Sequence, residues 1–140
     1  MIELYRDLII DHGVNPRNKY ILQCFTHSAK GFNHFCGDNF ILYLNIIDDI
    51  ICDISFEGQG CSISMASASL MTLSLKNKSV EYAFKMFDYM RDVIKGNIKQ
   101  DSQFYDINVL SNVKNFPSRV KCATLIWHTL NDALLYKGKS

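Results

Sequence analysis

A pair of adjacent β-rich runs constrains the fold of this chain more than any other feature. Residues 39–47 and 50–56 are rich in β-branched and aromatic side chains, and Asp48-Asp49 between them has the character of a tight turn. We therefore expect a hairpin of two antiparallel strands. In its second strand one set of alternating residues is apolar, which predicts that this set faces the core: Ile50, Cys52, Ile54 and Phe56.

The rest of the chain is mostly helical in pattern. Residues 2–12 predict a short helix that ends before Asn15-Pro16, and residues 22–30 predict a first strand. Residues 95–105 are polar and predict an irregular excursion, after which Pro117 marks the start of a last helix. Apolar residues recur at spacings of three and four in three stretches after the hairpin: Ile63, Ala66, Leu70 and Leu73; Val80, Phe84, Phe87 and Met90; Val120, Ala123, Trp127, Leu130 and Leu134.

This order of elements predicts an α+β fold, a small three-stranded antiparallel sheet with helices packed on its apolar face. A chain of 140 residues fits one domain, residues 1–140, with enough core to fold without a metal or a disulfide. The formal charge of +1 gives no electrostatic reason to expect a nucleic-acid partner. The charged start lacks a signal-peptide cleavage site and no apolar run is long enough for a membrane span, so we expect a cytoplasmic protein without a membrane partner.

Five cysteines, an odd number at irregular spacing, are the candidate reactive residues. Disulfides are not expected in a cytoplasmic chain, so metal binding, thiol chemistry or burial must explain each one. Cys52 falls on the predicted apolar face and Cys24 near the start of the first strand, and we interpret both as buried and inert. The other three lie at junctions between elements: Cys36 before the hairpin, Cys61 at its exit and Cys122 in the last helix.

The hairpin predicts that some of these junctions meet. A chain that enters the first strand at Asp38 returns to the same end of the sheet after the second, so Cys36, Asp38 and Cys61 can lie together. Cys61 and Cys122 are near helix N-termini, where peptide dipoles favour a thiolate, and Lys121 adds positive charge. Three thiolates and a carboxylate are typical of a tetrahedral zinc site or an open iron–sulfur site. A zinc ion with only a structural role is a third interpretation.

Three basic side chains near these cysteines have alternative explanations. Arg119 either contacts the site or is a surface charge in the first turn of the last helix. His34 is interpreted as an exposed loop residue in preference to a metal ligand, and His128, almost two turns after Cys122, as a helix-surface residue.

Four segments together resemble the U-type iron–sulfur scaffold proteins, the family that includes NifU N-terminal domains, IscU and SufU. In the family's order they are Asn15-Pro16-Arg17-Asn18, Cys36-Gly37-Asp38, GQGCSIS at 58–64 with the MASAS that follows, and Arg119-Val120-Lys121-Cys122-Ala123 with Trp127. The chain resembles the SufU branch, because Cys61 and Cys122 lie 61 positions apart, residues 95–105 match an insertion of that branch, and the Leu-Pro-Pro-Val-Lys motif of IscU is absent. Two places depart from the family: His34-Phe35 stands where Pro-Thr is frequent, and Tyr20 replaces a glycine.

The resemblance implies a site and an activity. Cys36, Asp38, Cys61 and Cys122 would bind zinc, with Arg119 and Lys121 in support. The protein would activate a PLP-dependent cysteine desulfurase of the SufS type by accepting its persulfide sulfur on Cys36, which a desulfurase histidine displaces from zinc. It would act as a sulfurtransferase-like relay to downstream SUF assembly proteins, not as a stand-alone hydrolase or oxidoreductase. The alternative is an IscU-like scaffold that assembles and transfers a 2Fe–2S cluster on the same ligands.

Overall fold

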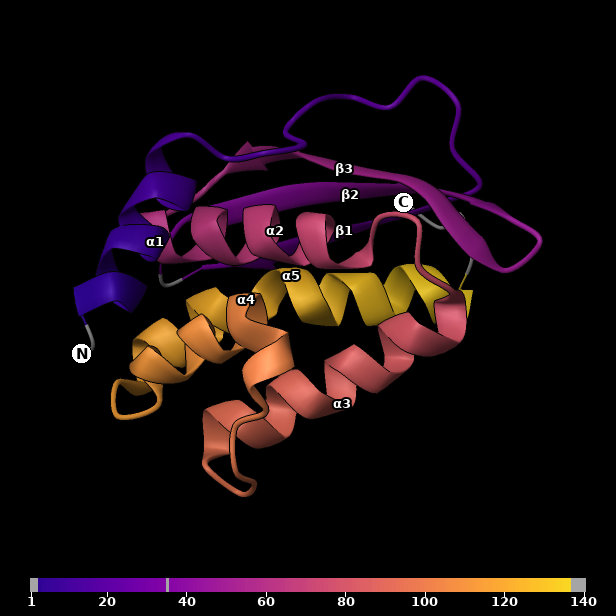
Figure 1. Ribbon diagram of the computed structural model, residues 1–140. Helices are drawn as coiled ribbons and strands as arrows, with labels where there is room; N and C mark the ends of the chain where they lie inside the picture. The colour runs from indigo at the N-terminus through magenta and orange to yellow at the C-terminus, as the bar shows by residue number, and fades with distance from the viewer. Residues whose placement is uncertain (1–2, 35, 137–140) are drawn as a thin grey trace.

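The structure, a computed structural model, describes residues 3–34 and 36–136. Its elements in chain order are α1 (Glu3–Val14), β1 (His27–Asn33), β2 (Asp38–Ile47), β3 (Ile50–Gln59), α2 (Ser62–Leu75), α3 (Val80–Lys95), the 3-10 helix η1 (Ser102–Phe104), α4 (Tyr105–Asn108), the 3-10 helix η2 (Val109–Val113) and α5 (Pro117–Tyr136). The strands form one antiparallel sheet in the order β1-β2-β3. In Figure 1, α2 and α5 lie against one face of the sheet, α3 lies beyond α5, and the loop after α1 passes over the opposite face. The predicted α+β architecture is confirmed.

The β2–β3 hairpin forms where it was predicted. Its turn residues Asp48 and Asp49 have φ values of 51° and 63°, the left-handed conformation that a two-residue hairpin turn requires. β3 continues to Gln59, three residues beyond the predicted strand. This extension carries the chain back to the end of the sheet where β2 begins, since Asn39 pairs with Gln59.

The predicted alternation in β3 is wrong at its start. Asn45 pairs with Asp53 but the next residue, Ile46, pairs with Ile51, so Cys52 is an extra residue in a β-bulge. A bulge breaks the alternation, so the residues before it face opposite sides from those that the pattern after it predicts. Ile51 is therefore fully buried while Ile50 is exposed, and Cys52 is only half-buried. Beyond the bulge, Ile54 and Phe56 face the core as predicted.

The first strand starts later than predicted. β1 begins at His27, five residues after the expected start, and continues to Asn33. The preceding residues form a loop that contacts β3 through a bridge between Lys19 and Phe56 and through a hydrogen bond from the Tyr20 hydroxyl to Asp53. Cys24 lies in this loop and is exposed, so its interpretation as a buried residue is wrong. Residues 22–26 do not form a strand, although the backbone N–H of Thr26 at their end already donates to the carbonyl of Leu44 in β2.

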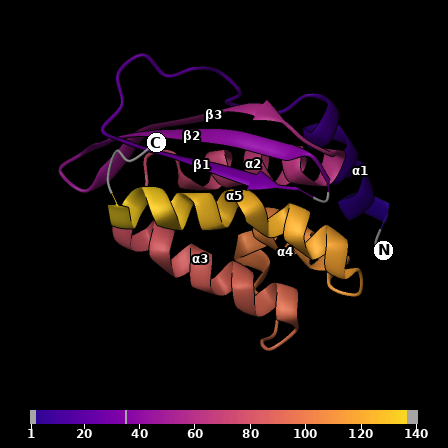
Figure 2. The same ribbon diagram turned by 180° about the vertical axis from the view of Figure 1, so that it is seen from behind.

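Helices α2 and α5 pack between the sheet and the other helices. α2 packs on α1 and α5, and α5 runs along β1 and β2, as Figure 2 shows from behind. Residues 66–72 of α2 are all buried, and most of them are alanine or serine. Small side chains let α2 approach its neighbours closely on several sides. α5 begins at Pro117, as predicted, and buries the side that carries Cys122 and Trp127.

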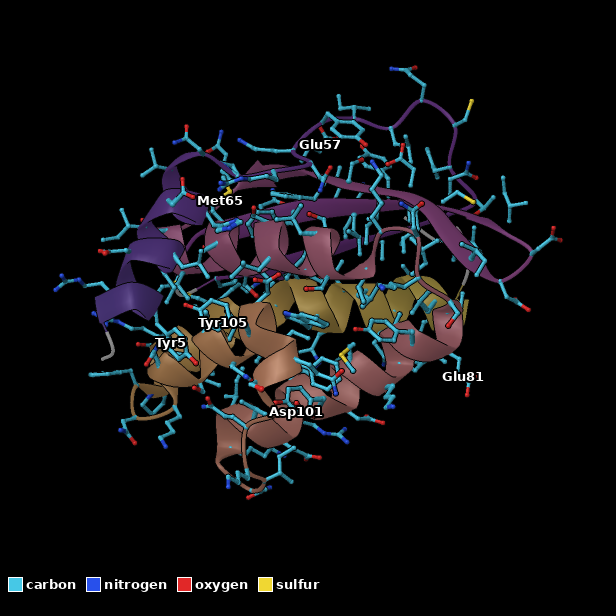
Figure 3. The ribbon with its side chains drawn as sticks, in the orientation of Figure 1. Tyr5, Glu57, Met65, Glu81, Asp101 and Tyr105 are labelled. Carbon is cyan, nitrogen blue, oxygen red and sulfur yellow. The ribbon has the colours of Figure 1, made fainter. Side chains whose placement is uncertain are left out.

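The polar segment between α3 and α5 is partly ordered. α3 ends at Gly96, whose φ of 74° is the left-handed conformation of a helix C-cap. Residues 96–101 are irregular, as predicted, but residues 102–113 form short helical turns. Figure 3 shows Tyr5 of α1 beside Tyr105 of α4, and their rings pack edge to face with centroids 5.3 Å apart. None of the helices in the described part of the chain has the length and apolar character needed to cross a membrane.

Candidate metal centre

Four chain segments meet at one end of the sheet. Cys36 lies in the turn after β1, Asp38 is the first residue of β2, and Cys61 is the N-cap of α2. Cys122 lies in the second turn of α5 and is 2% exposed. The sulfur atoms of Cys36 and Cys122 and a carboxylate oxygen of Asp38 all lie within 4.8 Å of one another. The structure therefore brings three of the four predicted ligands into one group.

Cys61, the fourth predicted ligand, lies beside this group of three. Its thiol contacts the thiol of Cys122 and is 3.5 Å from the hydroxyl of Ser64. The Cys122 thiol in turn donates to the sulfur of Cys36 at 2.9 Å. Cys36, Cys61 and Cys122 line one open pocket of about 490 Å³. The arrangement presents three thiols to the same space, with the carboxylate of Asp38 buried next to them.

The two oxygens of Asp38 have different surroundings. Oδ1 accepts a hydrogen bond from the backbone N–H of Cys61 at 3.0 Å and another from the hydroxyl of Ser64 at 3.1 Å. Oδ2 is buried and has no hydrogen-bond partner among the residues that the structure describes. A buried carboxylate oxygen without a partner is costly, and a coordinated cation removes that cost. The donor set, three thiols and one oxygen, fits zinc, and iron in a cluster also takes thiolate ligands.

Gly60 makes room for this arrangement. A Cβ atom at this position would lie 2.4 Å from Oγ of Ser64 and 2.7 Å from Oδ1 of Asp38, well inside van der Waals contact. The glycine therefore lets the backbone pass close to the carboxylate and start α2 at once. The position of Gly60 in the GQGCSIS motif follows from this close approach.

The surroundings of Cys122 affect the pKa of its thiol. Burial, followed by contacts with the thiols of Cys36 and Cys61, raises the pKa of Cys122 above its ordinary value in the metal-free chain. Lys121 is exposed and is not among the residues that line the pocket. Burial therefore acts against the thiolate form that the helix N-terminus and Lys121 were expected to favour at Cys122. A bound cation would favour the thiolate instead, since metal-ligating thiols are deprotonated.

The four candidate ligands differ in how firmly they are held. Cys122 is buried in α5, Asp38 is 1% exposed, and Cys61 is half-buried at the start of α2. Cys36 is exposed, and the next residue, Gly37, has a φ of 68° with open space around the position where a Cβ would lie. Cys36 is therefore the thiol that an incoming protein reaches first.

The structure also places the three basic side chains that the sequence put near the cysteines. Arg119 lines the thiol pocket, and its guanidinium stacks on the ring of Phe116 at 4.9 Å, so it is both a surface charge and a neighbour of the site. His34 is exposed with its ring against Phe32, which agrees with its interpretation as a loop residue, and His128 is exposed on α5 as predicted. Phe35, one of the positions that depart from the family, lies outside the described residues.

Sequence reasoning missed polar residues around the site, among them Ser64 and His12. Ser64 binds Asp38, and its place three residues after Cys61 in the first helical turn is the only signal that the sequence offers. His12 lies under the Asn-Pro-Arg-Asn segment, where its Nδ1 and the backbone N–H of Arg17 both bind the hydroxyl of Ser69, at 2.7 and 2.8 Å. No spacing in the sequence indicates that α1 contacts α2.

Comparison with known proteins identifies relatives of this fold and site. A family model described as the NifU-like N terminal domain matches residues 4–123. The chain is 45% identical to the zinc-dependent sulfurtransferase SufU of Bacillus subtilis over 132 residues, which cover 94% of this chain and 89% of that protein. It is 35% identical to the iron–sulfur cluster assembly scaffold protein IscU of Thermotoga maritima, with 94% of this chain and 92% of that protein covered.

A solved structure shows the same arrangement of elements. The crystal structure named as FiSufU, an iron–sulfur cluster assembly scaffold protein for the SUF system from Fervidobacterium islandicum AW-1, matches with a TM-score of 0.84 and 33% identity. The match covers 91% of this chain and 94% of that chain. With the match over residues 4–123, these similarities show that the chain belongs to the NifU-like N-terminal domain family of U-type iron–sulfur assembly proteins, in its SufU branch.

Proposed function

We propose that this protein is a zinc-dependent sulfur relay for iron–sulfur cluster assembly, which accepts persulfide sulfur from a SufS-type cysteine desulfurase. The observation that carries the proposal is a buried, unpartnered oxygen of Asp38 next to three thiols, of which one is exposed. The 45% identity to a relative named as a zinc-dependent sulfurtransferase supports this choice within the family.

The proposed zinc ligands are Cys36, Asp38, Cys61 and Cys122. Bound zinc would keep the thiols deprotonated at neutral pH, in a site that burial alone biases toward the neutral thiol. Removing any of the three firmly held donors should weaken zinc binding, because each offers a ligand atom from a different element: β2, α2 and α5.

Cys36 is the proposed sulfur acceptor. Its thiolate attacks the terminal sulfur of the persulfide on the desulfurase cysteine, a new sulfur–sulfur bond forms on Cys36, and the desulfurase cysteine leaves as a thiolate. No external oxidant or reductant is needed, because the persulfide only changes carrier. The exposed position of Cys36 suits this role, since the partner's persulfide must reach its sulfur directly.

The surroundings of the pocket suit a negatively charged reactant. Residues 107–131 contain Lys114, Arg119 and Lys121 and no aspartate or glutamate. A persulfide anion and an acidic docking surface are both attracted to such a segment. We propose that Arg119, which lines the pocket, and Lys121 assist docking of the desulfurase, and that the relay acts in the cytoplasm with downstream SUF assembly proteins.

A desulfurase activation assay tests the proposal. Adding the zinc-loaded protein to a purified SufS-type desulfurase should sharply raise cysteine turnover, and Cys36→Ala should abolish the increase. Cys24→Ala is the matched control, because Cys24 is also exposed but lies in the loop before β1. Unchanged turnover with the zinc-loaded chain, or equal effects of the two substitutions, would overturn the relay.

A second candidate function is cluster assembly on the same ligands. Its support is the 35% identity to an IscU scaffold protein and the match to FiSufU, which is itself named a scaffold protein. Anaerobic reconstitution with iron and sulfide separates the two functions. A cluster that forms and moves to an apo-protein supports the scaffold, whereas zinc that stays bound and blocks loading supports the relay.

A further inference from the structure

Ser64 contacts two of the proposed ligands and is not itself a metal donor in the proposed site. It is 1% exposed in the first turn of α2, with its hydroxyl 3.1 Å from Oδ1 of Asp38 and 3.5 Å from the sulfur of Cys61. We propose that Ser64 is a positioning residue for the metal centre: its hydroxyl holds Oδ1 of Asp38 and leaves Oδ2 as the oxygen available to the metal. The inference rests on the proposed zinc site.

The hydroxyl of Ser64 has one hydrogen and two nearby oxygen acceptors. Besides Oδ1 of Asp38, the carbonyl oxygen of Cys61 lies 3.0 Å away. That carbonyl already accepts the helical hydrogen bond from the N–H of Met65, at 3.0 Å. A carboxylate is the stronger acceptor, and hydrogen bonds to charged groups are about twice as strong as those between neutral groups. The hydroxyl of Ser64 is therefore expected to donate its hydrogen to Oδ1 of Asp38.

The position of Ser64 is itself fixed by the packing of α2. Further along the same helix, Ser67 donates to the backbone carbonyl of Ala123 in α5 and Ser69 binds His12 of α1. At the N-terminal side, Gly60 leaves space for the hydroxyl and the carboxylate to meet, because a Cβ there would lie within 2.7 Å of both oxygens. A rigid helix thus carries the group that orients the carboxylate.

This arrangement joins Asp38 and Cys61 into one unit. The N–H of Cys61 and the hydroxyl of Ser64 both bind Oδ1, so the carboxylate cannot rotate without breaking two hydrogen bonds. The hydrogen bonds of this unit do not involve the exposed Cys36, so the unit can hold its geometry independently of that thiol. Residues that orient metal ligands typically contribute 10- to 100-fold to metal affinity.

A double-mutant cycle on the full chain tests the inference. Zinc affinity is measured by competition with a chromogenic chelator for the wild type, Ser64→Ala, Asp38→Ala and the double variant. We expect Ser64→Ala to weaken zinc binding by about 10- to 100-fold. In the Asp38→Ala background the same change should have no further effect, because Ser64 acts through the carboxylate.

Ser62→Ala is the matched control. Ser62 lines the same pocket two residues away on the same helix but is exposed, and neither hydrogen bond to Asp38 within the described chain comes from it. Its zinc affinity should equal that of the wild type. Cobalt(II) gives a second readout: the absorption spectrum of Ser64→Ala should shift toward that of Asp38→Ala, while that of Ser62→Ala should not move.

Equal losses of affinity in both backgrounds would overturn the inference, as would wild-type affinity in Ser64→Ala. If Ser64→Ala does not fold, Gly60→Ala replaces it in the cycle, because its added methyl group would lie too close to both oxygens for the hydroxyl of Ser64 to keep its hydrogen bond to Oδ1. A wild-type chain that binds neither zinc nor cobalt would contradict the proposed function instead, so the two failures are distinguishable.

Discussion

Burial changes the chemistry of individual ionisable side chains at this site. Asp38 has one oxygen held by two donors and another that is buried without a partner, and Cys122 is buried against two other thiols. Burial disfavours negative charge on the sulfur of Cys122, and a bound cation would offset this cost and give the buried Oδ2 of Asp38 a partner. Cys36 and Cys24, by contrast, are exposed to the solvent. Residues of the same type therefore differ in reactivity by position alone.

Alkylation rates test this difference. In the metal-free protein at neutral pH, iodoacetamide should modify Cys36 and Cys24 at least tenfold faster than Cys122, because burial both blocks access to Cys122 and raises its pKa. Adding zinc should protect Cys36 and leave Cys24 unchanged. Peptide mass spectrometry over a time course measures each rate. Zinc protection of Cys24, or rapid labelling of Cys122 in the folded metal-free chain, would contradict this assignment.

At the scale of elements, a small polar cluster holds α1, the following loop and α2 together. The hydroxyl of Ser69 accepts from the N–H of Arg17, so its own hydrogen is free to bind Nδ1 of His12. Asn18 adds a bond to Thr72 of α2 at 3.0 Å. The Asn-Pro-Arg-Asn segment therefore fastens the first helix to the helix that carries Cys61 and Ser64. Its role in this structure is to fix α2, at a distance from the thiols.

The histidine in this cluster predicts a pH dependence of stability. Burial, and then the charge of Arg17, lower the pKa of His12 below 6.5, against smaller opposite effects of Asp11 and Asp106. The unfolded chain then binds more protons than the folded chain below pH 6.5, so stability present above this pH is lost as the pH falls through the lower, folded pKa. Urea denaturation of metal-free protein at pH 7.5 and 5.5 should show a larger loss for the wild type than for His12→Gln. Equal losses in the two proteins would contradict the prediction.

The small residues of α2 predict a second effect at this scale. Ala68 is fully buried, so Ala68→Leu forces extra atoms into a packed interior and should destabilise the fold by about 1–3 kcal/mol. Leu73 on the same helix is 45% exposed, and Leu73→Ala should change stability by less than about 0.5 kcal/mol. Urea denaturation with a common slope measures both. A neutral Ala68→Leu would mean that α2 is less tightly enclosed than the structure shows.

The elements that sequence predicted well are those specified by local signals. The Asp48-Asp49 turn, the start of α5 at Pro117 and the helical repeats after Gly60 each depend on neighbouring residues, and all were confirmed. The bulge at Cys52 depends on how β3 pairs with β2, which no local pattern reveals. The start of β1 at His27 likewise depends on how this strand pairs with β2.

The candidate site shows the same limit. Its four proposed ligands could be named from motifs and from the return of the hairpin, but the orientation of Asp38 could not. Ser64 approaches the carboxylate only because α2 starts immediately after Gly60, and the pKa of Cys122 depends on burial by other elements. Three-dimensional packing decides these points, and a single sequence contains no separate signal for them.

At the scale of the whole molecule, the core is large and consists mainly of side chains other than the proposed metal ligands. Its largest fully buried side chains come from the sheet and from α2, α3 and α5, and they include Trp127, Phe40 and Phe56. Of the four proposed ligands, none belongs to the main hydrophobic cluster. The energy of the fold therefore comes mainly from apolar burial between sheet and helices, with the metal centre at one end.

This separation predicts that the protein folds without zinc. Treatment with a chelator should leave the helical circular dichroism within about 10% of its value, because the hydrophobic cluster does not depend on the ligands. Zinc should still raise the melting temperature by mass action, and zinc at 100 times Kd adds about 2.7 kcal/mol to the free energy of unfolding. Loss of the cooperative unfolding transition on chelation would show that zinc is structural. That result would count against the relay, in which Cys36 has to leave the metal while the protein stays folded. A retained transition, with zinc-dependent desulfurase activation, places the metal in function instead of folding.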